Sequence, residues 1–286
     1  MKIKSLVYTV GSLGCAAFIA VAPVKAGPMM APIDPVPIDT GISNLLDPIE
    51  TTLSVGFDSH YMFRGYNLGE EAVWAGIDMS LPLGWQGASL DFGLWYVNPT
   101  EGPSNTSGIG GPAFNAKRGI PDDELDAYIG VSGTWGPVDV SVGYVHYFLG
   151  PEAANNPLAA VNDQNEVGTT LGTSFGPIDF GFEYAYNFDL DTAKSGTWEF
   201  QHYWEPSVGT GFEVNDRISL NLSVAAGFYG DDFSHWQFGL SAPIVVAENV
   251  TFEPYVAYLD DRKPANIASP FTQDSWFGGV SLSVSF

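Results

Sequence analysis

From Thr51 onward, apolar and polar residues alternate along most of the chain. Val138 and Val140, for example, alternate with Asp139 and Ser141. A period of two residues is the period of a β-strand that has one apolar face. The segments that carry this pattern, and that we expect to be strands, are 51–64, 72–82, 88–98, 124–135, 138–148, 164–175, 178–187, 197–208, 218–229, 234–243, 250–258 and 274–286.

Short and long connections alternate between these segments. The stretches 134–144 and 174–184 repeat the same unit of strand, Gly-Pro turn and strand, whereas the connections at 99–121, 149–162 and 259–272 are long and rich in Pro, Asn, Gly and acidic residues. Outer-membrane barrels have short periplasmic turns and long external loops. The sequence therefore predicts an all-β fold, a transmembrane antiparallel up-and-down β-barrel of about twelve strands. The connection 205–217 is too long for a turn, which suggests a longer strand there.

A soluble β-sandwich would show the same alternation, and three features favour the membrane barrel. Lys is rare, as expected where charge would face lipid. The chain ends on an aromatic strand, in which Phe286, Val284 and Leu282 resemble the terminal strand that the barrel assembly machinery of the outer membrane recognises. Aromatic residues also cluster near strand ends, as in interfacial girdles; they include Tyr61, Phe63, Trp95, Tyr96, Trp135, Tyr144, Phe148 and Trp276.

The N-terminus has the features of an export signal. Lys2 and Lys4 precede an apolar run that ends at Ala22, and Val24-Lys25-Ala26 resembles a cleavage site. We therefore expect a signal peptide at 1–26, a Pro-rich linker at 27–50 and the barrel at 51–286. The alternative is a retained anchor, but the apolar run is short for a membrane span. Cys15 is the one cysteine and would leave with the signal, which excludes disulfides and Cys-ligated metals in the mature chain.

The net charge of the chain limits the classes of partner that it can bind. The formal net charge is −23, and removal of Lys2, Lys4 and Lys25 with the signal would take it to −26. Such a surface does not suit nucleic acid, which binds basic footprints. It suits cations or basic partners, although a salt-adapted or simply soluble surface explains the same charge.

The first predicted hairpin resembles a known family. Within Phe57–Asp78 the segment resembles the opening hairpin of the TorF-type family of porins, which shows Ser-Asp-Tyr-x-Phe-Arg-Gly and then Pro-Ala-x-Gln-Gly-Gly-x-Asp. The matching residues are Tyr61, Phe63, Arg64, Gly65, Ala72, Gly76 and Asp78, with Gly93 and Trp95 where the family often has Gly-x-Trp. The chain departs at Ser59-His60 and lacks the Pro and Gln of the second stretch. The resemblance implies an outer-membrane barrel with a poorly defined transport function, and it supplies no substrate.

If the apolar faces meet lipid, the alternate positions line the lumen. The residues expected there are Asp58, Arg64, Asp78, Asp91, Glu124, Asp126, Asp139, Glu166, Asp179, Glu183, Glu199 and Glu253. Because Arg64 is the one basic residue among them, the lumen should concentrate cations. The sequence thus predicts a porin-like outer-membrane channel for small solutes that prefers cations. We expect Arg64 to brace the first hairpin by bonding Asp58 or Asp78, in preference to clamping a substrate.

Other functions stay open beside the channel. A barrel plugged by its own side chains, with carboxylates paired to Arg64, would act as a structural or ligand-binding protein through its external loops. Acidic pairs near loop ends, such as Asp231-Asp232 and Asp260-Asp261, could bind Ca²⁺ there. We expect no enzyme, because the neighbours in Ser59-His60 and Ser234-His235 should point to opposite faces of a strand. Four histidines without a spaced pair predict neither a metal site nor a cofactor.

Overall fold

The computed structural model describes residues 49–85, 87–101, 123–149, 163–189, 201–262 and 274–286. The expected signal peptide at 1–26 and nearly all of the expected linker lie outside this part of the chain. The strands are β1 (Glu50–Phe63), β2 (Tyr66–Pro82), β3 (Ser89–Glu101), β4 (Glu124–Trp135), β5 (Val138–Leu149), β6 (Gln164–Phe175), β7 (Ile178–Asn187), β8 (His202–Asn215), β9 (Ile218–Tyr229), β10 (Asp232–Ser241), β11 (Ile244–Ala247), β12 (Val250–Asp261) and β13 (Ser275–Ser285).

These strands form one closed antiparallel ring. Each strand from β1 to β9 pairs with its neighbours in sequence, β12 pairs with β13, and β13 closes the ring by pairing with β1. The strands β10 and β11 both lie between β9 and β12, so they are two parts of one wall strand that is interrupted at Ala242-Pro243. Backbone bonds from Ser219 N–H to Pro243 O and from Ala242 N–H to Pro254 O continue the ladder across this break. The fold is therefore the twelve-strand β-barrel that the sequence predicted.

Within the described residues, no helix is long and apolar enough to cross a membrane.

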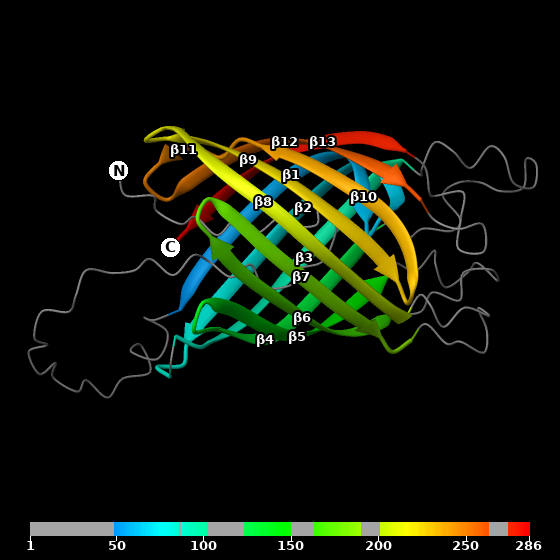
Figure 1. Cartoon of the computed structure of the whole chain (residues 1–286), viewed down its shortest axis with the longest axis horizontal. Coiled ribbons are helices and arrows are strands. Elements are labelled where there is room, and N and C mark those ends of the chain that lie inside the picture. Colours follow the sequence, from blue (N-terminus) through cyan, green and yellow to red (C-terminus); the bar gives the residue numbers. More distant parts are fainter. Residues whose placement is uncertain (1–48, 86, 102–122, 150–162, 190–200, 263–273) are drawn as a thin grey trace, which may run out of the picture.

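The two ends of the barrel differ in their connections. The chain enters β1 and leaves β13 at the same end, where the short turns after β2, β4, β6, β8 and β11 also lie. We call this the turn end. At the opposite end, which we call the loop end, β3, β5, β7 and β12 are each followed by a connection that is not described (Figure 1). The termini and turns on one side and the longer connections on the other match the predicted alternation.

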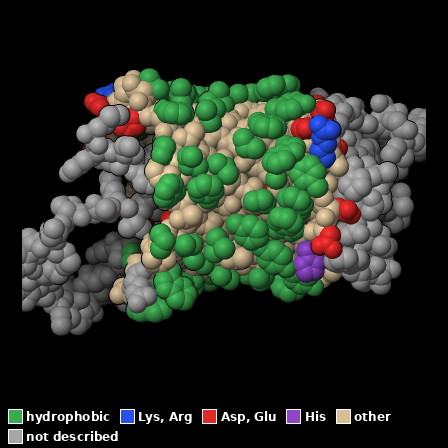
Figure 2. All heavy atoms as spheres, in the orientation of Figure 1, with side chains coloured by type: hydrophobic (Ala, Val, Ile, Leu, Met, Phe, Trp, Pro, Cys, Tyr) green, Lys and Arg blue, Asp and Glu red, His purple; other side chains and the backbone are tan. Residues whose placement is uncertain are grey.

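The outer wall of the barrel is apolar. Large hydrophobic side chains such as Val55, Ile129, Val142, Leu222 and Leu282 are exposed on it, each at a strand position that alternates with an inward one. On the face that Figure 2 shows, hydrophobic side chains form a belt across the middle of the barrel, and acidic, basic and His side chains lie near its ends. A contiguous apolar surface of this extent is unusual on a protein that faces water.

Exposed aromatic side chains lie near both ends of this belt. Trp135 and Phe175 stand beside turns at the turn end, and Trp276 lies near the loop end. Three aromatics that we expected in the girdles are elsewhere. Tyr61 packs at a tilt against Trp95, and Phe63 lies edge-on to Tyr147, all on the inner side of the wall. The girdle prediction is wrong for Tyr61 and Phe63, because β1 leaves the wall before it reaches them. It is wrong for Trp95 because this residue of β3 alternates with the outward Leu94 and Tyr96.

The departure of β1 from the wall is visible in its pairing. The ladder between β1 and β13 runs from Thr52 with Ser285 to Asp58 with Gly279, although β13 continues to Ser275. On the other side, β2 pairs with β3 only as far as Glu70 with Glu101. The intervening residues, Ser59 to Gly69, pair mainly with one another, with a register shift at Tyr61 and Met62. We call Ser59–Gly69 the hairpin tip.

Strand β8 differs from its predicted limits. It ends at Asn215 rather than Val208, which confirms the longer strand suggested by the connection 205–217. Its ladder with β9 has no pair at Glu205 or Pro206, since Pro has no N–H to donate to a ladder. The first residues of the predicted strand, at 197–200, lie outside the described part of the chain.

Candidate channel lumen

The residues predicted to line the lumen alternate with the exposed apolar positions of the wall. The structure places Asp58, Asp78, Asp91, Glu124, Asp126, Asp139, Glu166, Asp179, Glu183 and Glu253 at inward positions of β1 to β7 and β12. Glu199 lies outside the described residues. The Lys and Arg residues within the described ranges are Arg64, Arg217 and Arg262, and of these Arg64 lies inside the ring.

Arg64 occupies a turn rather than a strand position. Its φ of 48° and the φ of 81° at Gly65 place both residues in the left-handed region, as in a two-residue hairpin turn of type I′. Gly tolerates this conformation readily, whereas Arg adopts it at a cost in free energy. A side chain that makes strong contacts elsewhere can offset this cost.

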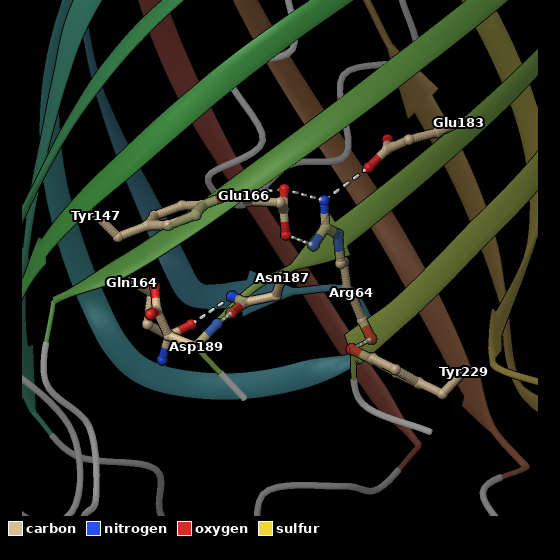
Figure 3. A network of polar contacts seen from close by, with 8 residues as sticks. All are labelled: Arg64, Tyr147, Gln164, Glu166, Glu183, Asn187, Asp189 and Tyr229. Atoms are coloured by element: carbon tan, nitrogen blue, oxygen red, sulfur yellow. Dashed lines mark hydrogen bonds and ion pairs between the residues drawn. The ribbon is translucent and has the colours of Figure 1, made fainter. Parts of the chain in front are cut away.

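The contacts of Arg64 are with the opposite wall. Its Nη1 lies 2.5 Å from Glu166 Oε2 and its Nη2 lies 2.9 Å from Glu166 Oε1, so the two side chains form a bidentate pair. Nη2 also donates to Glu183 Oε1 at 3.1 Å. Figure 3 shows the guanidinium between these two carboxylates. The expected bracing by Asp58 or Asp78 is wrong as stated, since these two carboxylates accept hydrogen bonds from Tyr255 and Tyr128.

Aromatic side chains surround the same guanidinium. Its central carbon lies 4.8 Å from the ring centroid of Phe63 and 4.8 Å from that of Tyr203, which are cation–π distances. Tyr147 donates to Glu166 at 3.1 Å, and Tyr229 donates to the backbone oxygen of Arg64 at 3.0 Å. Both side chains of the ion pair are almost fully buried by these rings.

The hairpin tip contacts the wall around most of the ring. Near its base, Tyr61 donates to Glu124 of β4 at 3.1 Å, and Met62 belongs to an apolar cluster with Leu259 of β12 and Phe277 of β13. At its end, Gly65 lies so close to His235 of β10 that a Cβ there would overlap the imidazole. Tyr61 also contacts β3, and Phe63 and Arg64 contact β5 to β9. Together, the residues of the tip contact every strand from β3 to β10, and also β12 and β13. The hairpin tip thus crosses the lumen in its loop-end half.

Below the hairpin tip, the lumen is lined by carboxylates that neutral groups hold in place. Asp91 accepts hydrogen bonds from Ser80 and Ser132, both at 2.6 Å. Near the turn end, Asp139 accepts from Thr134 at 2.7 Å and Asp179 from Ser174 at 2.6 Å. Hydroxyl donors stabilise a carboxylate without cancelling its charge, so this half of the lumen carries net negative charge.

Two serine–histidine pairs contradict our expectation from strand geometry. Ser59 Oγ lies 3.0 Å from His60 Nδ1, and Ser234 Oγ lies 3.0 Å from His235 Nδ1. The alternation of faces fails because Ser59 begins the hairpin tip and Ser234 lies at a register shift between Phe233 and His235. The expectation that the two side chains of each pair point to opposite faces, and so cannot form a dyad, is therefore wrong.

Each of these pairs lies where the hairpin tip meets the wall. Ser59 Oγ also accepts a hydrogen bond from the backbone N–H of Gly278 at 3.0 Å, where β1 has left β13. His235 Nε2 lies 3.7 Å from Glu205 Oε2, so Ser234, His235 and Glu205 together have the residue types of a hydrolase triad. Ser234 and His235 are both 0% exposed, so a substrate could not approach the hydroxyl in this arrangement.

Sequence reasoning missed several residues that hold the hairpin tip. Tyr147, Tyr229 and His235 all contact it, and none of them is among the residues predicted to line the lumen. Strand alternation could have placed Tyr147 and Tyr229 inward, because their neighbours Phe148 and Phe228 fit the apolar face. His235 could not be placed this way, since it follows a register shift.

No arrangement of three or more His, Cys, Asp and Glu side chains suited to a metal ion occurs among the described residues. The acidic pairs Asp231-Asp232 and Asp260-Asp261 lie at the loop end, and their binding of Ca²⁺ stays a prediction.

Structural comparison matches this barrel with solved outer-membrane proteins at low similarity. The COG4313 outer membrane channel from Pseudomonas putida F1 is 10% identical, with a TM-score of 0.48 over 87% of this chain and 100% of that one. The NanC porin is 11% identical, with a TM-score of 0.46 over 82% and 98%, and the KdgM porin in complex with disordered oligogalacturonate is 6% identical, with a TM-score of 0.43 over 83% and 99%. Similarity this low carries no conclusion about function.

Sequence comparison assigns the chain to a family. A search of curated proteins gave no match. One family model matches residues 44–274, which is most of the chain and nearly all of the barrel. The description of that family does not mention TorF-type porins, so the resemblance to them stays a prediction. Because the match covers well over half of its residues, the chain belongs to the family described as bacterial protein of unknown function (Gcw_chp).

Proposed function

We propose that this protein is a porin-like channel of the outer membrane that passes small solutes and prefers cations. The observation that supports this most is the charge of the lumen. Its inward carboxylates mostly accept hydrogen bonds from neutral hydroxyl groups. Among the described residues, Arg64 is the basic side chain inside the ring that offsets their negative charge. A pore lined in this way attracts cations and repels anions.

The outer wall supports the placement in a membrane. A closed barrel leaves no strand edge without a partner, which a bilayer requires, and the apolar belt of Figure 2 offers a surface for lipid. The predicted export signal favours the outer membrane over the inner one. Phe286, Val284 and Leu282 would then present the last strand to the barrel assembly machinery, and Val284 and Leu282 lie on the outward face of β13.

A second candidate is a non-conducting barrel that acts through its external loops. The observation that favours it is the hairpin tip, which crosses the lumen and contacts the wall on nearly every side. In that case the carboxylates would serve to hold the tip in place. The two candidates differ in whether ions cross the barrel.

A planar bilayer separates the two candidates. The protein, purified from membranes, is added to a bilayer that separates two KCl solutions of different concentration. We expect discrete current steps with a reversal potential on the cation-selective side. A folded barrel that gives no steps would support the non-conducting candidate, and anion selectivity would contradict the proposed charge preference.

The contribution of one lumen carboxylate can be measured in the same bilayer. Asp78 is exposed to solvent inside the barrel, so Asp78→Asn should lower the cation-to-anion permeability ratio roughly twofold by removing a charge beside the ion path. Asp216→Asn is the matched control, since Asp216 is exposed in the turn between β8 and β9. Equal ratios in the two variants would show that Asp78 does not act on permeating ions.

A further inference from the structure

The hairpin tip is joined to the barrel differently from every other part of the wall. Beyond Asp58 it has left the β13 ladder, and before Glu70 it has left the β3 ladder. Its own two strands remain paired to each other from His60 with Glu70 to Phe63 with Tyr66. The tip could therefore swing out of the lumen as a unit without breaking a ladder of the ring.

The base of the hairpin tip has the features of a hinge. Glu71 follows the tip directly and has a φ of 53°, which is a strained conformation for a residue that is not Gly. On the other strand, Ser59 Oγ accepts a hydrogen bond from the backbone N–H of Gly278, at the point where β1 departs from β13. Both strands of the hairpin thus change direction at the same level of the barrel.

The strongest contacts of the hairpin tip are at its far end. Tyr66 packs edge-on against Tyr229, and Met62 packs with Leu259 and Phe277, but these are apolar contacts that other packings can replace. Arg64, by contrast, makes charge-assisted bonds to two carboxylates on the opposite wall. A Gly or Asn would adopt the positive φ of this turn position at a lower cost in free energy. The presence of Arg there is explained if its side chain is needed for these bonds.

We propose that the hairpin tip is a movable plug and that Arg64, through Glu166 and Glu183, is the latch that holds it closed. The plug would regulate the channel of the proposed function, and its effect on conductance rests on that function. Movement of the tip does not rest on it, and it can be measured separately. When the latch opens, the tip leaves the loop-end half of the lumen and uncovers the acidic path below it.

A single introduced cysteine reports the movement of the plug. Met62 is buried between the tip and β12 and β13, and the mature chain would otherwise have no cysteine, since Cys15 falls in the predicted signal peptide. The reporter Met62→Cys is treated with a membrane-impermeant thiol reagent in three backgrounds: unchanged, Arg64→Gln and Arg262→Gln. Arg262 is the matched control, because it loses the same charge from an exposed pair with Asp260.

We expect Arg64→Gln to accelerate labelling about ten- to a hundredfold, the effect of losing charge-assisted bonds that hold a closed state. Arg262→Gln should leave the rate unchanged. Each variant is first shown to be a folded barrel by its heat-dependent migration on a gel. If Arg64→Gln does not fold, Glu183→Gln replaces it, with a smaller acceleration, because the pair with Glu166 remains. Equal rates in the Arg64 and Arg262 backgrounds would overturn the latch.

Bilayer recordings of the same variants separate the two proposals. Faster labelling together with longer or larger current steps in Arg64→Gln supports both the latch and the channel. Faster labelling without current in any variant keeps the latch and rejects the channel. Current in all variants with unchanged labelling keeps the channel and rejects the latch.

Discussion

The variant Arg64→Met is expected to unfold in urea with a free energy about 3 kcal/mol below that of the wild type. Methionine fills much of the volume of the arginine side chain but leaves Glu166 and Glu183 without the cation that compensates their burial. Removal of one partner from a buried ion pair costs more than the pair contributes, because the remaining charge is uncompensated. Tryptophan fluorescence of the protein in lipid vesicles measures the transition.

A triple variant tests the cause of this loss. Arg64→Met combined with Glu166→Gln and Glu183→Gln removes the two charges as well as the arginine, and it should recover most of the lost free energy. Arg262→Met serves as the control and should change stability little, since its ion pair is exposed. If the triple variant were as unstable as the single one, packing rather than charge would explain the role of Arg64.

The variant Gly93→Ala is expected to lower the free energy of unfolding by about 2 kcal/mol or more. Gly93 faces the lumen from β3, directly opposite Tyr128 of β4. A Cβ at this position would overlap the phenol oxygen of Tyr128 and the backbone oxygen of Ile77. The backbone oxygen belongs to the ladder of the ring and cannot move aside, so the substitution strains the wall and displaces the bond between Tyr128 and Asp78.

A second inward glycine provides the comparison for this variant. Gly172 of β6 has Asp139 Cβ as the nearest atom to an added Cβ, at 3.8 Å, which is an ordinary contact. Gly172→Ala should therefore be neutral or slightly stabilising, since Ala loses less chain entropy on folding than Gly. The urea transition in vesicles gives both values. A similar loss in the two variants would mean that any inward Cβ is harmful, and that overlap with Tyr128 and Ile77 is not the cause.

Local alternation was enough to predict the wall of this barrel. The segments 124–135, 164–175 and 178–187 were predicted with the bounds that β4, β6 and β7 have in the structure. They are regular because a strand between lipid and lumen must alternate at every position. The pairing of β1 with β13, at opposite ends of the chain, followed from the requirement that the ring be closed.

The hairpin tip could not be predicted by the same reasoning. Tyr61 and Phe63 continue the apolar period of β1, so the pattern places them toward lipid although the chain has already left the wall. What turns them inward is a set of partners distant in sequence, such as Glu124 for Tyr61 and Glu166 for Arg64. A period of two residues contains no information on contacts across the lumen. The hydrogen bonds of Ser59 with His60 and of Ser234 with His235 were not predicted for a related reason. They occur where the two-residue period of the strand is broken.

The short ladder between β1 and β13 has a consequence for how the barrel folds. This ladder joins residues such as Thr52 and Ser285, which are 233 positions apart, so its formation closes nearly the whole chain into a loop and costs more conformational entropy than any hairpin of the wall. Because the hairpin tip turns inward, β1 contributes to this seam only between Thr51 and Asp58. We therefore expect the seam to form last and to separate first. Backbone amides on either side of it should then exchange their hydrogens sooner than those of the ladder between β4 and β5.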